Sequence, residues 1–108
     1  MNKEEIRKAL EGKGAVMEIG SPNDGYARFF TGRSWLANLS EDKDIPVYNV
    51  TFENGAHTHW HIHHGTSQVL IVVSGKGYLQ YEGQAPRQFH PGDVVTNPPV
   101  VTDWHGAA

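Results

Sequence analysis

Apolar residues follow two different patterns along the chain, and the pattern changes near residue 15. In residues 4–11, Ile6 and Leu10 are four positions apart, as on one face of a helix. Asn2 stands at a capping position, and Gly12 follows the last periodic residue. The pattern predicts one or two turns of helix, although a frayed terminal tail is equally compatible with it. Residues 1–14 are therefore expected to form a short helix or tail that precedes the main domain.

From residue 15 onward, short apolar runs alternate with turn residues. The runs with strand character are residues 16–19, 47–52, 57–63, 68–73, 78–81, 94–95 and 100–105. Turn residues separate them, and the Asn54-Gly55 step is a strong hairpin signal. Strands that recur about every ten residues are typical of an antiparallel sandwich or barrel. Residues 15–108 are thus predicted to form one all-β domain.

Five of the seven histidines lie within residues 57–64. In an extended strand, successive side chains point to opposite faces, so His57, His59, His61 and His63 would share one face. Imidazoles two positions apart on a strand can reach one metal ion. A solvated, histidine-rich edge would show the same spacing. If residues 57–63 and 68–73 form a hairpin, the carboxamide of Gln68 would lie beside these rings, as a weak ligand or as a hydrogen-bonding neighbour.

Composition and charge exclude several classes of protein. A length of 108 residues suits a single domain. The absence of cysteine excludes disulfide scaffolds, thiolate zinc sites and cysteine nucleophiles. A formal net charge of −3 argues against nucleic acid as a partner. No apolar run approaches the ~18 residues of a membrane span, and the charged N-terminal segment lacks the apolar stretch of a signal peptide. No membrane partner is expected, and a cytoplasmic location is the default expectation.

The motifs of the second half resemble those of the cupin family. At the spacing of the first cupin motif stand Gly55, His61, His63, Gln68 and Gly75, with glutamine where many members have glutamate. Gly92 and Pro98 fit the second motif, whereas Asp103 stands at its histidine. Four stretches are similar to a branch of small single-domain bacterial cupins that includes manganese-dependent hydroxynitrile lyases and proteins associated with carboxymuconolactone decarboxylase: residues 51–55, 60–65, 91–95 and 104–107.

The resemblance implies a double-sheet jelly-roll barrel that holds a divalent metal such as manganese, iron, nickel or zinc. It assigns His61, His63 and Gln68 as metal ligands and places the fourth ligand at Asp103. A carboxylate can replace an imidazole and suits hard ions such as Mn²⁺ or Fe²⁺. His105 would share a strand face with Asp103 and could contribute instead. Asp103 could equally be a loop carboxylate outside a three-ligand site.

A metal-dependent enzyme that acts on a small molecule is the first functional hypothesis. His59 or His105 would move a proton beside the metal, in a lyase-like or isomerase-like reaction at a hydroxy or carbonyl substrate. A dioxygenase with the same site is one alternative, and a non-catalytic module that binds a carbohydrate or metabolite is the other. The family comparison also predicts an unpaired edge strand near Ala108, which favours a homodimer.

Overall fold

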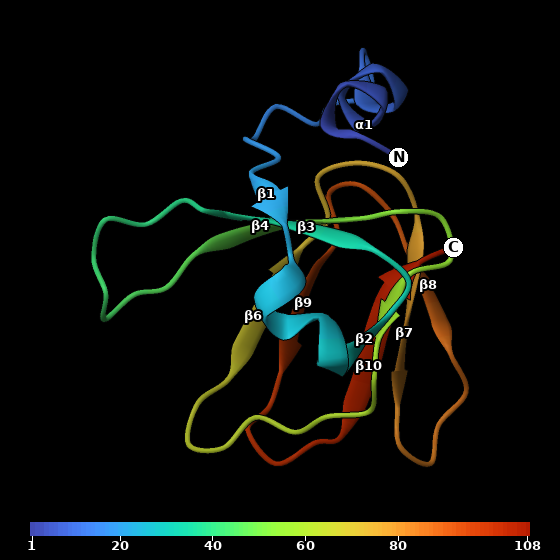
Figure 1. Cartoon of the computed structure of the whole chain (residues 1–108). Coiled ribbons are helices and arrows are strands. Elements are labelled where there is room, and N and C mark those ends of the chain that lie inside the picture. The colour runs from blue at the N-terminus through green and yellow to red at the C-terminus, as the bar shows by residue number, and fades with distance from the viewer.

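The computed structural model describes residues 1–108 and places helix α1 (Lys3–Leu10) at one end of a β domain (Figure 1). Asn2 caps this helix: its side chain accepts the N–H of Glu5, and the Glu5 carboxylate accepts the N–H of Asn2. Ile6 is buried against Trp35 of the β domain. The helix predicted over residues 4–11 is therefore present, beginning and ending one residue earlier, with its apolar face packed on the domain.

Trp35 also takes part in a small charged cluster on this side of the molecule. Its indole Nε1 donates to Glu53 Oε2 at 3.1 Å, and the Met1 ammonium lies 3.2 Å from Oε1 of the same carboxylate. Burial alone would raise the pKa of Glu53. The hydrogen bonds from Trp35 and the Met1 ammonium, with the positive charges of that ammonium and of Arg33, lower the pKa below its ordinary value.

Three antiparallel sheets make up the β domain (Figure 1). The first has the order β1-β3-β4, with strands β1 (Ser21–Pro22), β3 (Ser34–Asn38) and β4 (Tyr48–Phe52). The second has the order β2-β5-β10-β7-β8, with strands β2 (Phe30–Thr31), β5 (His57–Thr58), β10 (Asp103–Ala107), β7 (Gly77–Tyr81) and β8 (Arg87–Phe89). The third pairs β6 (Gln68–Ile71) with β9 (Val94–Asn97). This arrangement confirms the predicted antiparallel jelly-roll fold with a short N-terminal helix.

One predicted strand is missing. Residues 16–19 form no strand, because Ile19 alone turns into the interior, where it is 8% exposed, while Val16 is 82% exposed. Gly20 follows with a positive φ of 80°, and a Cβ at this position would overlap the backbone carbonyl of Leu36. A 3₁₀ helix, η1 (Asp24–Phe29), occupies part of the segment that reads as a turn in the sequence.

A β-bulge interrupts the pairing between the histidine segment and β10. Gly106 pairs with His57, and Asp103 pairs with His61. The histidine segment thus advances four residues while β10 advances three, so the histidine segment contains one extra residue. The extra residue leaves the N–H of His105 without a backbone acceptor, and the hydroxyl of Thr58 accepts it at 3.1 Å. The bulge changes the alternation of side chains along this segment. Thr58 and His61 therefore lie on the same face as Asp103 and His105 of β10, although two residues separate them.

The interior of the barrel is unusual in what it buries. The largest fully buried side chains are Leu79, Asn97 and Asp103, so two of the three are polar. Phe52 of β4 packs edge-on against His105 of β10, with ring centroids 6.0 Å apart. Buried polar groups are costly unless they have partners, so the effect of Asn97 and Asp103 on stability depends on what each of them contacts. The structure has no helix with the length and apolar character of a membrane span.

Candidate metal centre

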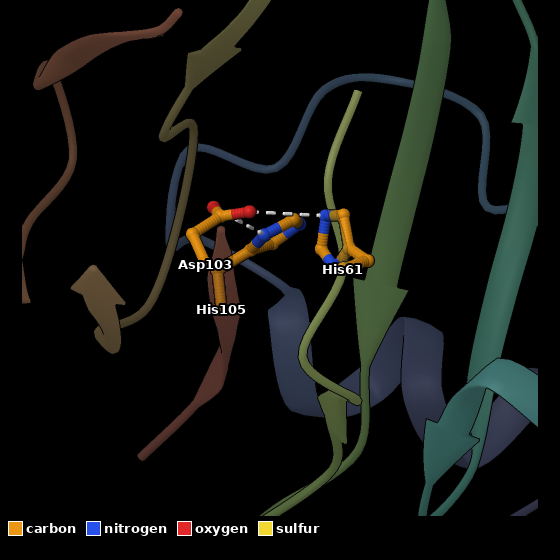
Figure 2. A group of neighbouring side chains, drawn as sticks. All are labelled: His61, Asp103 and His105. Carbon is orange, nitrogen blue, oxygen red and sulfur yellow. Dashed lines mark ion pairs between the residues drawn. The ribbon is translucent and has the colours of Figure 1, made fainter. Parts of the chain in front are cut away.

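Asp103 is the first residue of β10, and its side chain is completely buried. Its Oδ2 accepts a hydrogen bond from Asn97 Nδ2 at 3.1 Å. Its Oδ1 has no hydrogen-bond partner and faces His61 Nε2 at 3.2 Å (Figure 2). A carboxylate is almost never fully buried unless a cation or hydrogen-bond donors compensate its charge.

His61 is held opposite Asp103 by two backbone hydrogen bonds of 2.9 Å, one in each direction. Its Nδ1 lies 2.9 Å from the carbonyl oxygen of His59. A carbonyl oxygen can only accept, so Nδ1 carries the proton and donates. In the neutral ring, Nε2 then carries a lone pair, which faces the unpartnered carboxylate oxygen. Two acceptors this close require a cation or an added proton between them.

Two more imidazoles adjoin this pair. His105 follows Asp103 by two positions on β10, and its Nδ1 lies 3.7 Å from Asp103 Oδ2 (Figure 2). The ring of His63 lies edge-on to that of His61, with centroids 5.0 Å apart. We refer to His61, His63, Asp103 and His105 as the candidate centre. Three buried side-chain polar atoms in the chain lack a hydrogen-bond partner, and all three belong to it: His63 Nε2, Asp103 Oδ1 and His105 Nδ1.

The donor atoms of the candidate centre fit a divalent cation. One donor atom each from His61, Asp103 and His105 lies within 4.8 Å of the other two. Atoms that bind one first-row ion at ~2.0–2.2 Å lie about 3 Å apart when they are adjacent, which matches the 3.2 Å between His61 and Asp103. Imidazole nitrogen and carboxylate oxygen are both ordinary ligands of such ions. A cation would also supply the compensation that the unpartnered atoms lack.

Gln68 lies at the edge of this centre, joined to it through Asn97. The two residues are cross-strand partners in the β6–β9 pair, and Asn97 Nδ2 donates to Gln68 Oε1 at 3.2 Å. Residues 57–63 and 68–73 do not form the hairpin that would have placed Gln68 beside the histidine rings, because β6 pairs with β9 instead. Asn97 was not among the residues predicted for the site. The sequence does contain an indication of its role: Asn97 follows Val95 by two positions, so in a β-branched strand it lies on the same inward face although it is polar.

His57 and His59 lie away from the candidate centre. The ring of His57 packs on Trp104 with centroids 5.4 Å apart, and His59 Nε2 lies 3.1 Å from the hydroxyl of Thr31. A groove of about 260 Å³ is lined here by His57, Thr58, His59, Trp60 and Trp104. The expectation that four alternating histidines share one face is therefore wrong, because the bulge separates His57 and His59 from His61.

Comparisons with known proteins agree with this architecture. Residues 48–108 match the protein family described as the cupin domain. The chain is 42% identical over 98 residues to a protein of Granulicella tundricola named (R)-mandelonitrile lyase, covering 86% of this chain and 74% of that protein. It is also similar to the crystal structure of a cupin-like protein from Thermotoga maritima. That match has a TM-score of 0.77 and 47% identity, covering 86% of this chain and 71% of the other.

Proposed function

The chain belongs to the cupin domain family, and from this premise we propose that it is a metal-dependent lyase that cleaves small α-hydroxynitriles. The observation that carries the proposal is the pair formed by His61 Nε2 and Asp103 Oδ1, which lie 3.2 Å apart, with the carboxylate fully buried and its Oδ1 without a hydrogen-bond partner. The relative named (R)-mandelonitrile lyase supports the choice of substrate class.

His61 and Asp103 would hold the metal, with His63 as the next ligand, and Gln68, which is linked to Asp103 through the Asn97 amide, as the fourth. The carboxylate favours a hard ion such as Mn²⁺ or Fe²⁺ over Ni²⁺ or Zn²⁺. When bound, a divalent metal supplies Lewis acidity to a substrate oxygen and stabilises the negative charge that develops there. The remaining work of the reaction falls to side chains of the protein.

His105 also belongs to the candidate centre, but its role in the proposal is to move the proton and not to bind the metal. It faces Asp103 Oδ2, which the Asn97 amide already bonds, whereas His61 faces the free Oδ1. The Nδ1 of His105 is buried, has no hydrogen-bond partner and lies beside the candidate ligands. In the cleavage of an α-hydroxynitrile, this nitrogen takes the hydroxyl proton and the O–H electrons form the aldehyde C=O bond. The C–CN bond breaks with its electrons on cyanide, and the proton returns to give hydrogen cyanide. A role for His59 in proton transfer stays a prediction, which its place on the outer face does not favour.

Metal analysis of protein purified without a nickel column tests the proposal. Wild-type protein should carry or take up about one Mn²⁺ or Fe²⁺ per chain, and His61→Ala should abolish this. His90→Ala is the matched control, because the His90 side chain is exposed and its nearest charged neighbour is Asp93, which is not part of the candidate centre. Metal-loaded protein should release cyanide from mandelonitrile, and His105→Ala should retain the metal but lose turnover.

Other results would favour the alternatives. Metal binding without cyanide release, but with oxygen consumption, would favour the dioxygenase. Metal binding without turnover of any substrate would favour a binding module. Absence of metal uptake by the wild-type protein would refute the proposed metal centre.

A homodimer and a cytoplasmic location also belong to this proposal. The outward face of the β6–β9 pair carries Val69, Ile71 and Val94, which are 57%, 65% and 63% exposed. A stable dimer buries about 800 Å² of each partner, and apolar side chains on a sheet face suit such a contact. Light scattering should give the mass of two chains, and Ile71→Lys should shift it toward one.

A further inference from the structure

We propose that Asn97 is the positioning residue that fixes how Asp103 and Gln68 face the metal. The inference rests on the proposed function, because it concerns the same centre. Asn97 ends strand β9, and its side chain is 1% exposed. It contacts both residues by hydrogen bonds without being a ligand candidate itself.

The orientation of the Asn97 amide is determined by its three neighbours. Its Nδ2 donates to Gln68 Oε1 at 3.2 Å and to Asp103 Oδ2 at 3.1 Å. Its Oδ1 accepts the hydroxyl of Tyr81 at 2.6 Å. If the two ends of the amide were exchanged, its oxygen would face two acceptor oxygens, so only one orientation is favourable. The amide is therefore held in one orientation, and both its nitrogen and its oxygen are hydrogen-bonded.

This arrangement makes the two carboxylate oxygens of Asp103 unequal. Oδ2 is occupied by the amide of Asn97, whereas Oδ1 is left free and faces His61. Asp103 is thereby prepared to bind a cation through a single oxygen. Without Asn97, the carboxylate could rotate, and its free oxygen would no longer be held toward His61.

Strand register builds the same arrangement without any help from a metal. Gln68 is the cross-strand partner of Asn97 in the β6–β9 pair, and Asp103 is the partner of Tyr81 in the β7–β10 pair. Asn97 thus joins a residue pair of one sheet to a residue pair of another. Arg87 lies 5.4 Å over the ring of Tyr81, which helps to hold the phenol in place.

Mn²⁺ titration of four variants tests the inference by calorimetry and by the electron paramagnetic resonance spectrum of the bound ion. Asn97→Ala should weaken Mn²⁺ binding by about 10- to 100-fold and alter the spectrum. Tyr81→Phe, which removes only the hydroxyl on the amide, should weaken it by a smaller factor in the same direction. Asn49→Ala and Tyr78→Phe are matched controls. The Asn49 amide bonds only the Glu18 carbonyl, Tyr78 has no side-chain hydrogen bond, and both should bind like wild type.

The possible failures are distinguishable. If wild type binds Mn²⁺ and a folded Asn97→Ala protein has the same affinity and spectrum, the inference is overturned while the metal centre stands. If Asn97→Ala does not fold, Tyr81→Phe decides the question by the same comparison. The carboxyl ¹³C signal of Asp103 in metal-free protein gives an independent readout. It should shift in both variants, and an unchanged signal overturns the inference even if wild type binds no metal.

Discussion

The substitution Asp103→Asn should change stability and metal binding in opposite directions. Asparagine has nearly the same shape as aspartate but no charge. Its amide oxygen could keep the hydrogen bond from Asn97, and its NH₂ group could donate to His61 Nε2, which lies 3.2 Å from Asp103 Oδ1. The variant therefore replaces two facing acceptors with a donor and an acceptor.

The size of the stability change follows from the burial of this carboxylate. Asp103 is 0% exposed, and one of its oxygens has no partner, so the charge is poorly compensated in metal-free protein. Removing an uncompensated polar group from a buried site should stabilise the metal-free protein by ~1–3 kcal/mol. For a domain of this size, that corresponds to a rise in Tm of about 5–15 °C.

Metal affinity should fall in the same variant. With Mn²⁺ at 100 times its Kd, wild type should gain about 2.7 kcal/mol of stability. If Asp103→Asn binds about 100-fold more weakly, the same Mn²⁺ concentration should add only ~0.4 kcal/mol. Asp44→Asn, at an exposed position, should change neither quantity.

Thermal unfolding in chelator and in Mn²⁺ measures both effects. The expected result is a higher Tm than wild type in chelator and a much smaller rise on adding Mn²⁺. A lower Tm in chelator would refute the reasoning, because it would mean that the charge of Asp103 is already compensated in the metal-free protein. An undiminished rise with Mn²⁺ would remove Asp103 from the ligand set.

Three further predictions concern the scaffold. Thr58→Val removes the acceptor of the His105 N–H and should cost ~1–3 kcal/mol in urea unfolding, whereas Thr58→Ser should retain most of the stability. Leu79→Ala, at a site that is 1% exposed, should cost ~2–5 kcal/mol in the same assay, against less than ~0.5 kcal/mol for Val16→Ala, at a site that is 82% exposed. The pKa of Glu53 is lowered in the folded state, so its contribution is present above the unfolded pKa of ~4.3 and is lost as pH falls through the folded value. Wild type should therefore be more stable than Glu53→Gln near neutral pH, and urea unfolding should show the difference vanish in acid; a constant difference would contradict this.

Local sequence signals correctly predicted those strands whose residue pattern is matched by a neighbouring strand with which they pair. Residues 47–52, 68–73 and 78–81 alternate or are β-branched, and strands β4, β6 and β7 occupy most of these runs. The residues 16–19 carry a similar signal, yet only Ile19 reaches the core. Strand formation requires a neighbour with free backbone groups as well as a suitable sequence, and the sequence does not name that neighbour.

Sequence reasoning about the centre relied on strand alternation, and alternation holds only in an unbroken strand. One extra residue between His57 and His61 reverses the faces, as a one-residue slip always does in a sheet. The separation of His59 from His61 therefore depends on pairing with a strand more than forty positions away in the chain. Asn97 was missed for a related reason: its role exists only because β6, β7 and β10 bring Gln68, Tyr81 and Asp103 around it.

The bulge has a consequence for the chemistry as well as for the fold. In a regular strand, the imidazole beside His61 on the inner face would be His59, two positions earlier. The bulge directs His59 outward and leaves its carbonyl to accept the Nδ1 proton of His61, which holds Nε2 of that ring toward Asp103. The inner face then receives its further imidazole from β10, at His105. The same irregularity thus orients one candidate ligand and determines which histidine stands beside it.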